Sequence, residues 1–235
     1  MSYDLVLNVA PKDIYKVNYC LNSIKENFNK SPDNIFLVGQ YPINIPGTTW
    51  ISDSIATPFS KNKIKFHRQG WIFQQLVKIF PTFIENDEYM VVDSDVIFNK
   101  PIVVDKIFYI SSREQHHQPY FNFMKEFGIH ESYDHTFIND FMYFDRKICQ
   151  EMTGDPLDFF DRMNILLSDT CYPAEFEMYG HYVMSKYPNL YKVVHQKVET
   201  HGIFYPACWT PDSIDHLIKT YKNSDIDLFT IHTWT

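Results

Sequence analysis

The chain has 235 residues, and its 21 basic and 29 acidic side chains give a formal net charge of −8. A net negative protein repels phosphate backbones, so this balance disfavours a general nucleic-acid binder. Aromatic residues make up 17% of the chain against only 7 glycines, which excludes a disordered segment and predicts a folded protein with a large core.

The four cysteines are widely spaced and form no CxxC pair, so neither a zinc ribbon nor a thioredoxin-like motif is supported. The N-terminus lacks the basic stretch and apolar run of a signal peptide. No apolar segment reaches the ~18 residues that a membrane span needs. We therefore expect a soluble protein in a reducing, cytoplasmic compartment, with no transmembrane segment.

The first half of the chain alternates between apolar runs typical of buried strands and stretches with helical spacing. Three prolines, at 42, 46 and 58, indicate a long irregular connection after the second strand, and Pro81 is expected to end the second helix. The elements predicted here are, in chain order, a strand at 3–10, a helix over 14–28, a strand at 34–39, a helix over 69–80, and strands at 88–93 and 106–111.

The second half contains more helices and more aromatic residues. The predicted elements are a strand within 137–144, helices over 155–167, 174–187 and 213–221, and a last strand at 227–232. Alternating helices and nearly continuous apolar strands predict an α/β fold, with a mostly parallel central sheet flanked by helices. We expect a single domain over 1–235, with a nucleotide-binding half (1–112) and an acceptor-side half (113–235).

The strongest chemical signal is the acidic sequence Asp93-Ser94-Asp95 directly after an apolar strand. In open α/β sheets, ligands bind at the carboxyl ends of the strands. Two carboxylates one residue apart at such a position suit a hard divalent cation, which then holds a diphosphate. The alternative interpretation is an ordinary acidic turn after a strand.

Through this motif, the sequence resembles nucleotide-sugar-dependent glycosyltransferases of the GT-A fold, in which a DxD motif ends a central strand. Further segments fit the resemblance: 68–71 (RQGW) with Gln74, Gln75 and Lys78, then 204–206 (FYP) and 231–234 (IHTW). The resemblance implies a GT-A-like sheet and a Mn²⁺ or Mg²⁺ cofactor. It also implies a UDP- or GDP-type sugar donor and a glycan or glycoconjugate acceptor.

Carried over to this chain, the resemblance makes Asp93 and Asp95 the acidic motif and His232 a late metal ligand. Asp95 is expected to contact the metal directly, and Asp93 to lie closer to the ribose or to a metal-bound water. His201 is the competing candidate, because a neutral imidazole can complete a carboxylate-led metal shell.

The donor is expected at the end of the first strand, where Asn8 and Ala10 would receive the base and ribose. The alternative there is a plain strand–helix turn. Cations in an acidic chain are reasonable partners for diphosphate oxygens, so Arg68 and Lys78 are candidates, although Lys78 equally suits a solvated helix position. The predicted contacts to the nucleotide sugar also include Gln75, Asp93 and Ser94.

Acceptor activation needs a base, for which the candidates are Glu175, Glu177 and Asp140. The two glutamates begin a helix, where its dipole alone would stabilise them. Their spacing places them about 200° apart on that helix, so only one can face the site. Asp140 also suits hydrogen bonds to sugar hydroxyls.

The leading hypothesis is a metal-dependent glycosyltransferase that moves a sugar from a nucleoside-diphosphate sugar to a hydroxyl. A sugar nucleotidyltransferase is the nearer rival, but the segment 8–13 lacks its Gly-rich phosphate loop. A DxD phosphohydrolase would place its acidic motif after the first strand. A non-enzymatic glycan-binding module would explain the aromatic residues, some of which, such as Trp71, Tyr172, Tyr179 and Tyr182, suit a sugar-stacking platform.

Overall fold

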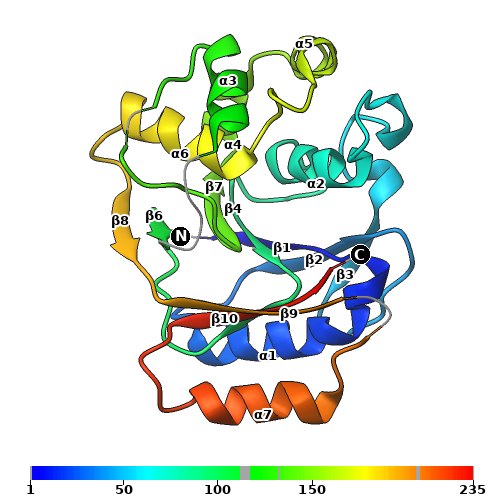
Figure 1. The fold of residues 1–235 in the computed structure, drawn as a ribbon, viewed down its shortest axis with the longest axis vertical. Coiled ribbons are helices and arrows are strands. Elements are labelled where there is room, and N and C mark those ends of the chain that lie inside the picture. Colours follow the sequence, from blue (N-terminus) through cyan, green and yellow to red (C-terminus); the bar gives the residue numbers. More distant parts are fainter. Residues whose placement is uncertain (1, 112–116, 132, 205–206, 235) are drawn as a thin grey trace.

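The computed structural model of the protein describes residues 2–111, 117–131, 133–204 and 207–234, and is built around a five-stranded sheet (Figure 1). The strand order is β3-β2-β1-β4-β7. The strands are β1 (Asp4–Asn8), β2 (Asn34–Gly39), β3 (Thr49–Ser52), β4 (Glu88–Asp93) and β7 (Phe141–Asp145).

The four strands β3, β2, β1 and β4 run parallel, and β7 joins the edge of the sheet antiparallel to β4. In the middle of the sheet, Leu7 of β1 pairs with Leu37 of β2 and with Val92 of β4. Every residue of β1 is buried. A parallel strand covered on both faces needs apolar side chains on both, which explains the continuous apolar runs of the sequence.

Helices cover both faces of this sheet (Figure 1). Helix α1 (Val17–Asn27) lies on one side, and α2 (Gln69–Ile79), α4 (Arg146–Thr153) and α6 (Glu175–Lys186) lie on the other. The remaining helices are α3 (Gln118–Glu126), α5 (Pro156–Leu166) and α7 (Pro211–Tyr221), and short 3₁₀ turns occur at Pro11–Lys16, Asp53–Ile55 and Lys61–Lys63. In the described part of the chain, every helix is too short or too polar to cross a membrane.

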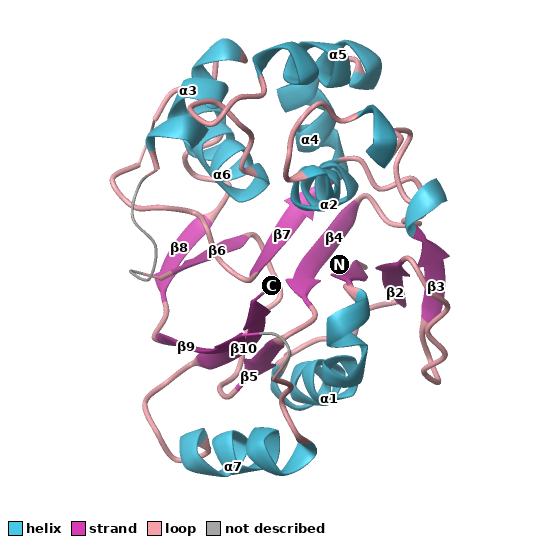
Figure 2. Ribbon diagram, turned by 45° about the vertical axis from the view of Figure 1, so that its right-hand side comes forward, coloured by secondary structure: helices cyan, strands magenta, loops and turns pink. Residues whose placement is uncertain are grey.

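A second, three-stranded sheet packs below the first one (Figure 2). It has the order β5-β10-β9, with β10 antiparallel to β5 and parallel to β9. Its strands are β5 (Val96–Phe98), β9 (Val198–Phe204) and β10 (Leu228–Trp234), and a separate parallel pair joins β6 (Ile107–Ile110) to β8 (Lys192–His195). Helix α7 covers the second sheet through a small core of Ile97, Ile214, Phe229 and Ile231.

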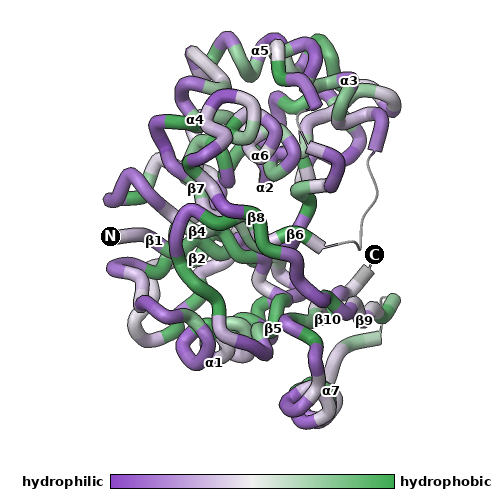
Figure 3. Tube along the Cα trace, turned by 90° about the vertical axis from the view of Figure 1, so that its left-hand side faces the viewer, coloured by the Kyte–Doolittle hydropathy of each residue, from purple (hydrophilic) through white to green (hydrophobic). Residues whose placement is uncertain are grey.

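One main hydrophobic core includes residues from Tyr3, just before the first strand, to Leu228 in the last strand, so both halves of the chain share it. Figure 3 shows hydrophobic residues concentrated in the inner strands and polar residues on outer helices such as α7. The predicted α/β fold, in one domain with a mostly parallel central sheet, is therefore confirmed.

The structure also contains elements that the sequence pattern does not predict. These are the short strands β3, β5 and β8, the seven-residue strand β9, and the helices α3 and α4. The predicted helix over 14–28 is divided into a 3₁₀ turn at Pro11–Lys16 and α1 at Val17–Asn27. Strands of three or four residues are too short to show a period, and α4 is recognisable mainly by its cap, since the Asp145 carboxylate accepts from the backbone of Lys147.

Candidate active site

The carboxyl ends of the parallel strands meet at one edge of the central sheet. Asn8 at the end of β1 lies opposite Asp93 at the end of β4. Because β7 is antiparallel, the residues that precede it reach the same edge, where the backbone N–H of Asp93 donates to the carbonyl of Asp140 at 2.8 Å. The topology thus brings three of the sequence-predicted site residues together.

A cavity of about 480 Å³ opens beside the ends of β1 and β2. Asn8, Ala10 and Arg68, three of the predicted donor-binding residues, line this cavity. Its other described lining residues include Lys12, Gln40, Asp53, Lys61, Trp71 and Gln74. A second cavity of about 490 Å³ adjoins it and shares Gln40, Asp53, Lys61 and Phe73.

The cavity wall is rich in exposed cations. The side chains of Lys12, Lys61 and Arg68 lie at its border and are solvent-exposed. The guanidinium carbon of Arg68 lies 4.2 Å from the centre of the Trp71 ring, a cation–π contact that orients the side chain. Asp53 adds one carboxylate, so the local charge is positive although the whole chain is acidic.

Two predicted donor-binding residues are buried amides, of which Asn8 lines the cavity and Gln75 does not. Asn8 is 8% exposed and Gln75 is 2% exposed. Among the described residues, neither the Nδ2 atom of Asn8 nor either amide atom of Gln75 has a hydrogen-bond partner. Gln75 points into the core, and its neighbour Gln74 lines the cavity, because consecutive helical residues face different sides.

Lys78 is buried between two carboxylates of the predicted site. Its Nζ lies 3.0 Å from Oδ1 of Asp93 and 2.8 Å from Oε1 of Glu175. Burial alone would lower the pKa of the Lys78 amine, but the two carboxylates outweigh it, and the pKa is raised. The Lys78 ammonium group thus links α2 to β4 and α6. It is hydrogen-bonded to these two carboxylates and is not exposed in the cavity.

Asp95 and His232 meet across the two sheets. Nδ1 of His232 lies 2.9 Å from Oδ2 of Asp95. The backbone of Ile231 also donates to the carbonyl of Asp95 at 3.0 Å. Burial raises the pKa of Asp95, but the hydrogen bond and charge of His232 outweigh it, so the pKa is lowered. Ser94, between the two acidic residues, is buried.

The position of His232 is fixed by a buried lysine that sequence reasoning did not single out. Lys16 Nζ donates to Oδ1 of Asp13 at 2.6 Å and to the carbonyl of Ile231 at 2.5 Å. It also donates to Oγ1 of Thr233 at 3.1 Å, so it holds the strand on both sides of His232. The only sequence signal is the i,i+3 pairing of Asp13 with Lys16, which does not reveal burial.

A carboxylate and an imidazole in contact form a donor set that suits Mn²⁺. In the described part of the chain, however, no group of three or more His, Cys, Asp or Glu side chains is arranged to hold a metal ion. Asp93, the third predicted ligand, directs Oδ1 to Lys78. The side chains of Asp95 and His232 therefore suit two positions in the coordination shell of a metal ion. Such an ion would need further oxygen ligands from a bound molecule.

The remaining predicted residues have different surroundings. Glu177 is fully buried and accepts from Oγ1 of Thr136 and, at 3.0 Å, from the backbone of Phe137. It therefore contacts the segment before β7, whereas Glu175 contacts Lys78. His201 pairs in register with Ile231, and its Nε2 lies 2.8 Å from the Tyr221 hydroxyl, toward α7. Residues 205 and 206 of the predicted FYP segment lie outside the described residues.

Comparisons with known proteins add the following. No curated protein sequence matches the chain. Mouse xyloside xylosyltransferase 1 in its apo form superposes with a TM-score of 0.46 and 9% sequence identity, over 98% of this chain and 97% of that chain. A profile described as a family of unknown function (DUF6492) matches residues 42–213. Since this match spans well over half of the 235 residues, the protein belongs to the DUF6492 family.

Proposed function

We propose that the protein is a metal-dependent glycosyltransferase that moves a sugar from a nucleoside-diphosphate sugar to a hydroxyl acceptor. One observation carries the proposal: a cationic cavity and an acidic–imidazole pair lie at the same carboxyl edge of the sheet. A sugar nucleotide has a base and ribose, a diphosphate, and a sugar to be transferred. This edge offers a recess, exposed cations, and a carboxylate and an imidazole of the kind that suits a metal ion.

In this proposal the donor's base and ribose enter the cavity beside Asn8 and Ala10. Arg68, together with Lys12 and Lys61, faces the diphosphate oxygens, because charge-assisted hydrogen bonds to phosphate are strong. Asp95 and His232 would hold a Mn²⁺ or Mg²⁺ ion. When bound, such an ion neutralises the negative charge that a departing diphosphate gains.

The buried residues around this edge would keep the reacting groups in position. Lys78 holds Asp93 and Glu175 at fixed places, and Lys16 holds the strand that carries His232. Of the three carboxylates offered by the sequence, Glu175 is hydrogen-bonded to Lys78 and Glu177 anchors the segment before β7. Asp140 lies at the same edge as Asp93, to whose backbone N–H its carbonyl is hydrogen-bonded, and we propose it as the acceptor of the proton.

The deciding experiment measures ligand binding and donor turnover on the purified chain. Thermal shifts are recorded with UDP, GDP and their sugar nucleotides, with and without Mn²⁺, since a ligand that binds only the folded state raises its stability. We expect a Mn²⁺-dependent shift and release of free nucleoside diphosphate. The Asp95→Ala variant should fold and lose both.

The same assay, extended to a nucleoside triphosphate with a sugar phosphate, separates this proposal from its rivals. A nucleotidyltransferase would release pyrophosphate from a nucleoside triphosphate and a sugar phosphate. A phosphohydrolase would release inorganic phosphate, and a glycan-binding module would release nothing from a sugar nucleotide. Retention of full donor turnover in Asp95→Ala, or the absence of any nucleotide-induced shift, would contradict the proposal.

A further inference from the structure

Four aromatic side chains from three separate segments cluster beside the candidate active site. Trp71 begins α2, His117 and Tyr120 lie at the start of α3, and Tyr172 precedes α6. The Tyr172 ring lies 5.6 Å from Trp71 and 5.4 Å from Tyr120, both edge to face, and Trp71 lies 6.5 Å from Tyr120. We call Trp71, His117, Tyr120 and Tyr172 the aromatic platform.

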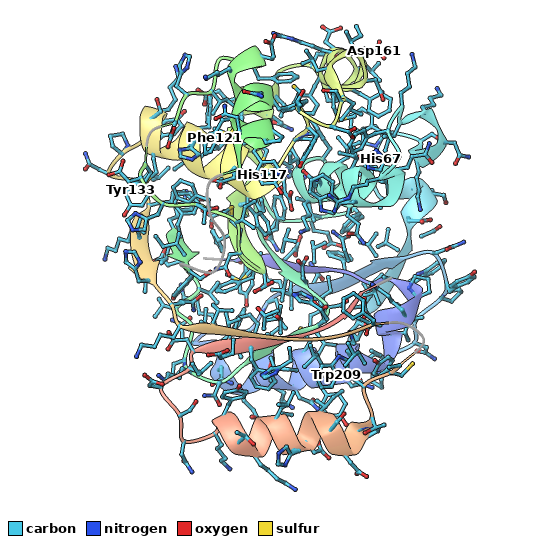
Figure 4. The ribbon with its side chains drawn as sticks, viewed as in Figure 1. His67, His117, Phe121, Tyr133, Asp161 and Trp209 are labelled. Atoms are coloured by element: carbon cyan, nitrogen blue, oxygen red, sulfur yellow. The ribbon has the colours of Figure 1, made fainter. Side chains whose placement is uncertain are left out.

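The platform is partly open to solvent, unlike the aromatic core. Trp71, Tyr120 and Tyr172 are half-buried and His117 is exposed. Nε2 of His117 lies 2.8 Å from the Tyr172 hydroxyl, so polar groups border the ring surfaces. Figure 4 labels His117 between α6 and α2. By contrast, Tyr179 is fully buried, and Tyr182 is hydrogen-bonded to Glu151 of α4.

The platform adjoins both parts of the candidate site. Trp71 also lines the cationic cavity. On α2, Trp71 and Lys78 are seven residues apart, so they share one face with a separation of roughly 10 Å along the axis. Tyr172 contacts Trp71, and Glu175 contacts Lys78. The segment 172–175 therefore runs along α2 from the platform to the carboxylates.

A ligand on this surface would meet partly exposed aromatic rings bordered by a hydroxyl and an imidazole. A pyranose ring matches this combination, because its C–H face packs on aromatic rings and its hydroxyls form hydrogen bonds at their border. A purely apolar ligand would make no use of this polar border.

We infer that the aromatic platform binds a pyranose unit of the acceptor, so that the acceptor is a saccharide. The inference rests on the proposed function, since it assigns the second substrate of the same site. The bound unit lies between the cavity that holds the donor and the carboxylate-bearing edge of the sheet, where a hydroxyl of the acceptor can reach the transferred sugar.

The test is a glycan microarray probed with the labelled full chain in the presence of Mn²⁺, UDP and GDP. We expect wild type to bind pyranose-containing glycans, and Tyr172→Ala to bind them about tenfold more weakly, as loss of one aromatic contact implies. Tyr120→Ala gives the same test if Tyr172→Ala fails to fold. Tyr172→Phe keeps the ring but removes the hydroxyl, so it should lose less binding than Tyr172→Ala does.

Tyr182→Ala is the matched control, because it removes a half-buried tyrosine of α6 that faces α4. It should leave glycan binding unchanged. Equal binding by wild type, Tyr172→Ala and Tyr120→Ala would overturn the inference, as would binding of 4-nitrophenol in place of any glycan. A wild type that shows nucleotide-induced thermal shifts but binds no glycan would also overturn it, whereas missing nucleotide shifts would count against the proposed function alone.

Discussion

Cations surround the candidate site in two different ways. On the closed side, Lys16 and Lys78 are buried, and each is hydrogen-bonded to partners within the fold. On the open side, Lys61 and Arg68 border the cavity and are exposed. A buried charge is tolerated only when the protein itself supplies its partners, whereas an exposed one can exchange water for a ligand. The buried lysines of the closed side therefore hold the residues of the site in position. The exposed cations of the open side can pair with the negative charge of a ligand.

Helix α2 connects the two sides. Arg68 immediately precedes it, and Lys78 lies near its end. The helix thus presents an open cation at one end and a compensated one at the other. The four predictions below test how far this difference extends, in descending order of expected effect.

Replacing Lys78 with methionine should cause the largest change. The variant leaves the buried carboxylate of Glu175 and the partly exposed carboxylate of Asp93 without their common partner. Removing one partner of a buried ion pair typically costs about 3–5 kcal/mol in the free energy of unfolding. Urea unfolding measures the loss. The double variant Lys78→Met/Glu175→Gln should recover part of it. The control is Lys61→Met, on the open side, which should change the free energy of unfolding by no more than about 0.5 kcal/mol. Equal losses in Lys78→Met and Lys61→Met would contradict the distinction between the closed and the open side.

Replacing Gly180 with alanine tests the packing of the closed side. A Cβ atom at Gly180 would lie 2.2 Å from Cγ of Phe137, whose backbone donates to Glu177. Overpacking of this kind costs about 1–3 kcal/mol. Thermal and urea unfolding are the measurements. Gly70→Ala is the matched helical control, because its Cβ would meet only the end of the Lys61 side chain at 3.6 Å, and it should be neutral or slightly stabilising.

Replacing Arg68 with alanine should weaken ligand binding without affecting the fold. Loss of one charge-assisted contact to a diphosphate corresponds to roughly tenfold weaker binding of UDP or GDP. Isothermal titration calorimetry measures the affinity, and the unfolding midpoint should stay close to that of wild type. A large loss of stability with unchanged nucleotide affinity would show that Arg68, like Lys16 and Lys78, serves the fold and not the ligand.

The smallest effect is expected at the other end of β4, where Asp87 forms surface ion pairs. Hydrogen bonds from Lys147 and then Arg146 lower the pKa of Asp87 from 3.8 to about 2. A carboxyl with a lowered pKa stabilises the fold above pH 3.8 and loses that contribution as the pH falls toward 2. Asp87→Asn should therefore melt slightly below wild type at pH 7, and the difference should shrink as the pH approaches 2. A constant difference across this range would exclude the ion pairs as its cause.

The central sheet could be predicted because its strands are long and continuously apolar, as in 88–93, which forms β4 without change of bounds. The helices over 69–80 and 174–187 agree with α2 and α6 to within one residue. Strands such as β5, with three residues, exist only because β10 pairs with them. A pairing partner more than a hundred residues away leaves no local pattern.

The site was predictable in part for a similar reason. Strand-end positions follow from the topology, so Asn8, Asp93 and Asp140 could be expected at one edge. Charge pairing across the fold could not be, and Lys78 is the example, because its two partners come from different elements. Asp53 was missed because the strand before it, β3, has only four residues; recognising β3 would have placed Asp53 at the same edge.

The contact between Asp95 and His232 joins residues 137 positions apart in the chain. Because closing a long loop costs conformational entropy, we expect this contact to form late in folding. During synthesis, the carboxylates of β4 emerge well before the strand that carries His232. A newly made chain would therefore complete its site only once β10 has inserted between β5 and β9. Spectroscopic probes near Asp95 or His232 would then report the formation of the native state, and earlier collapsed states would lack this contact.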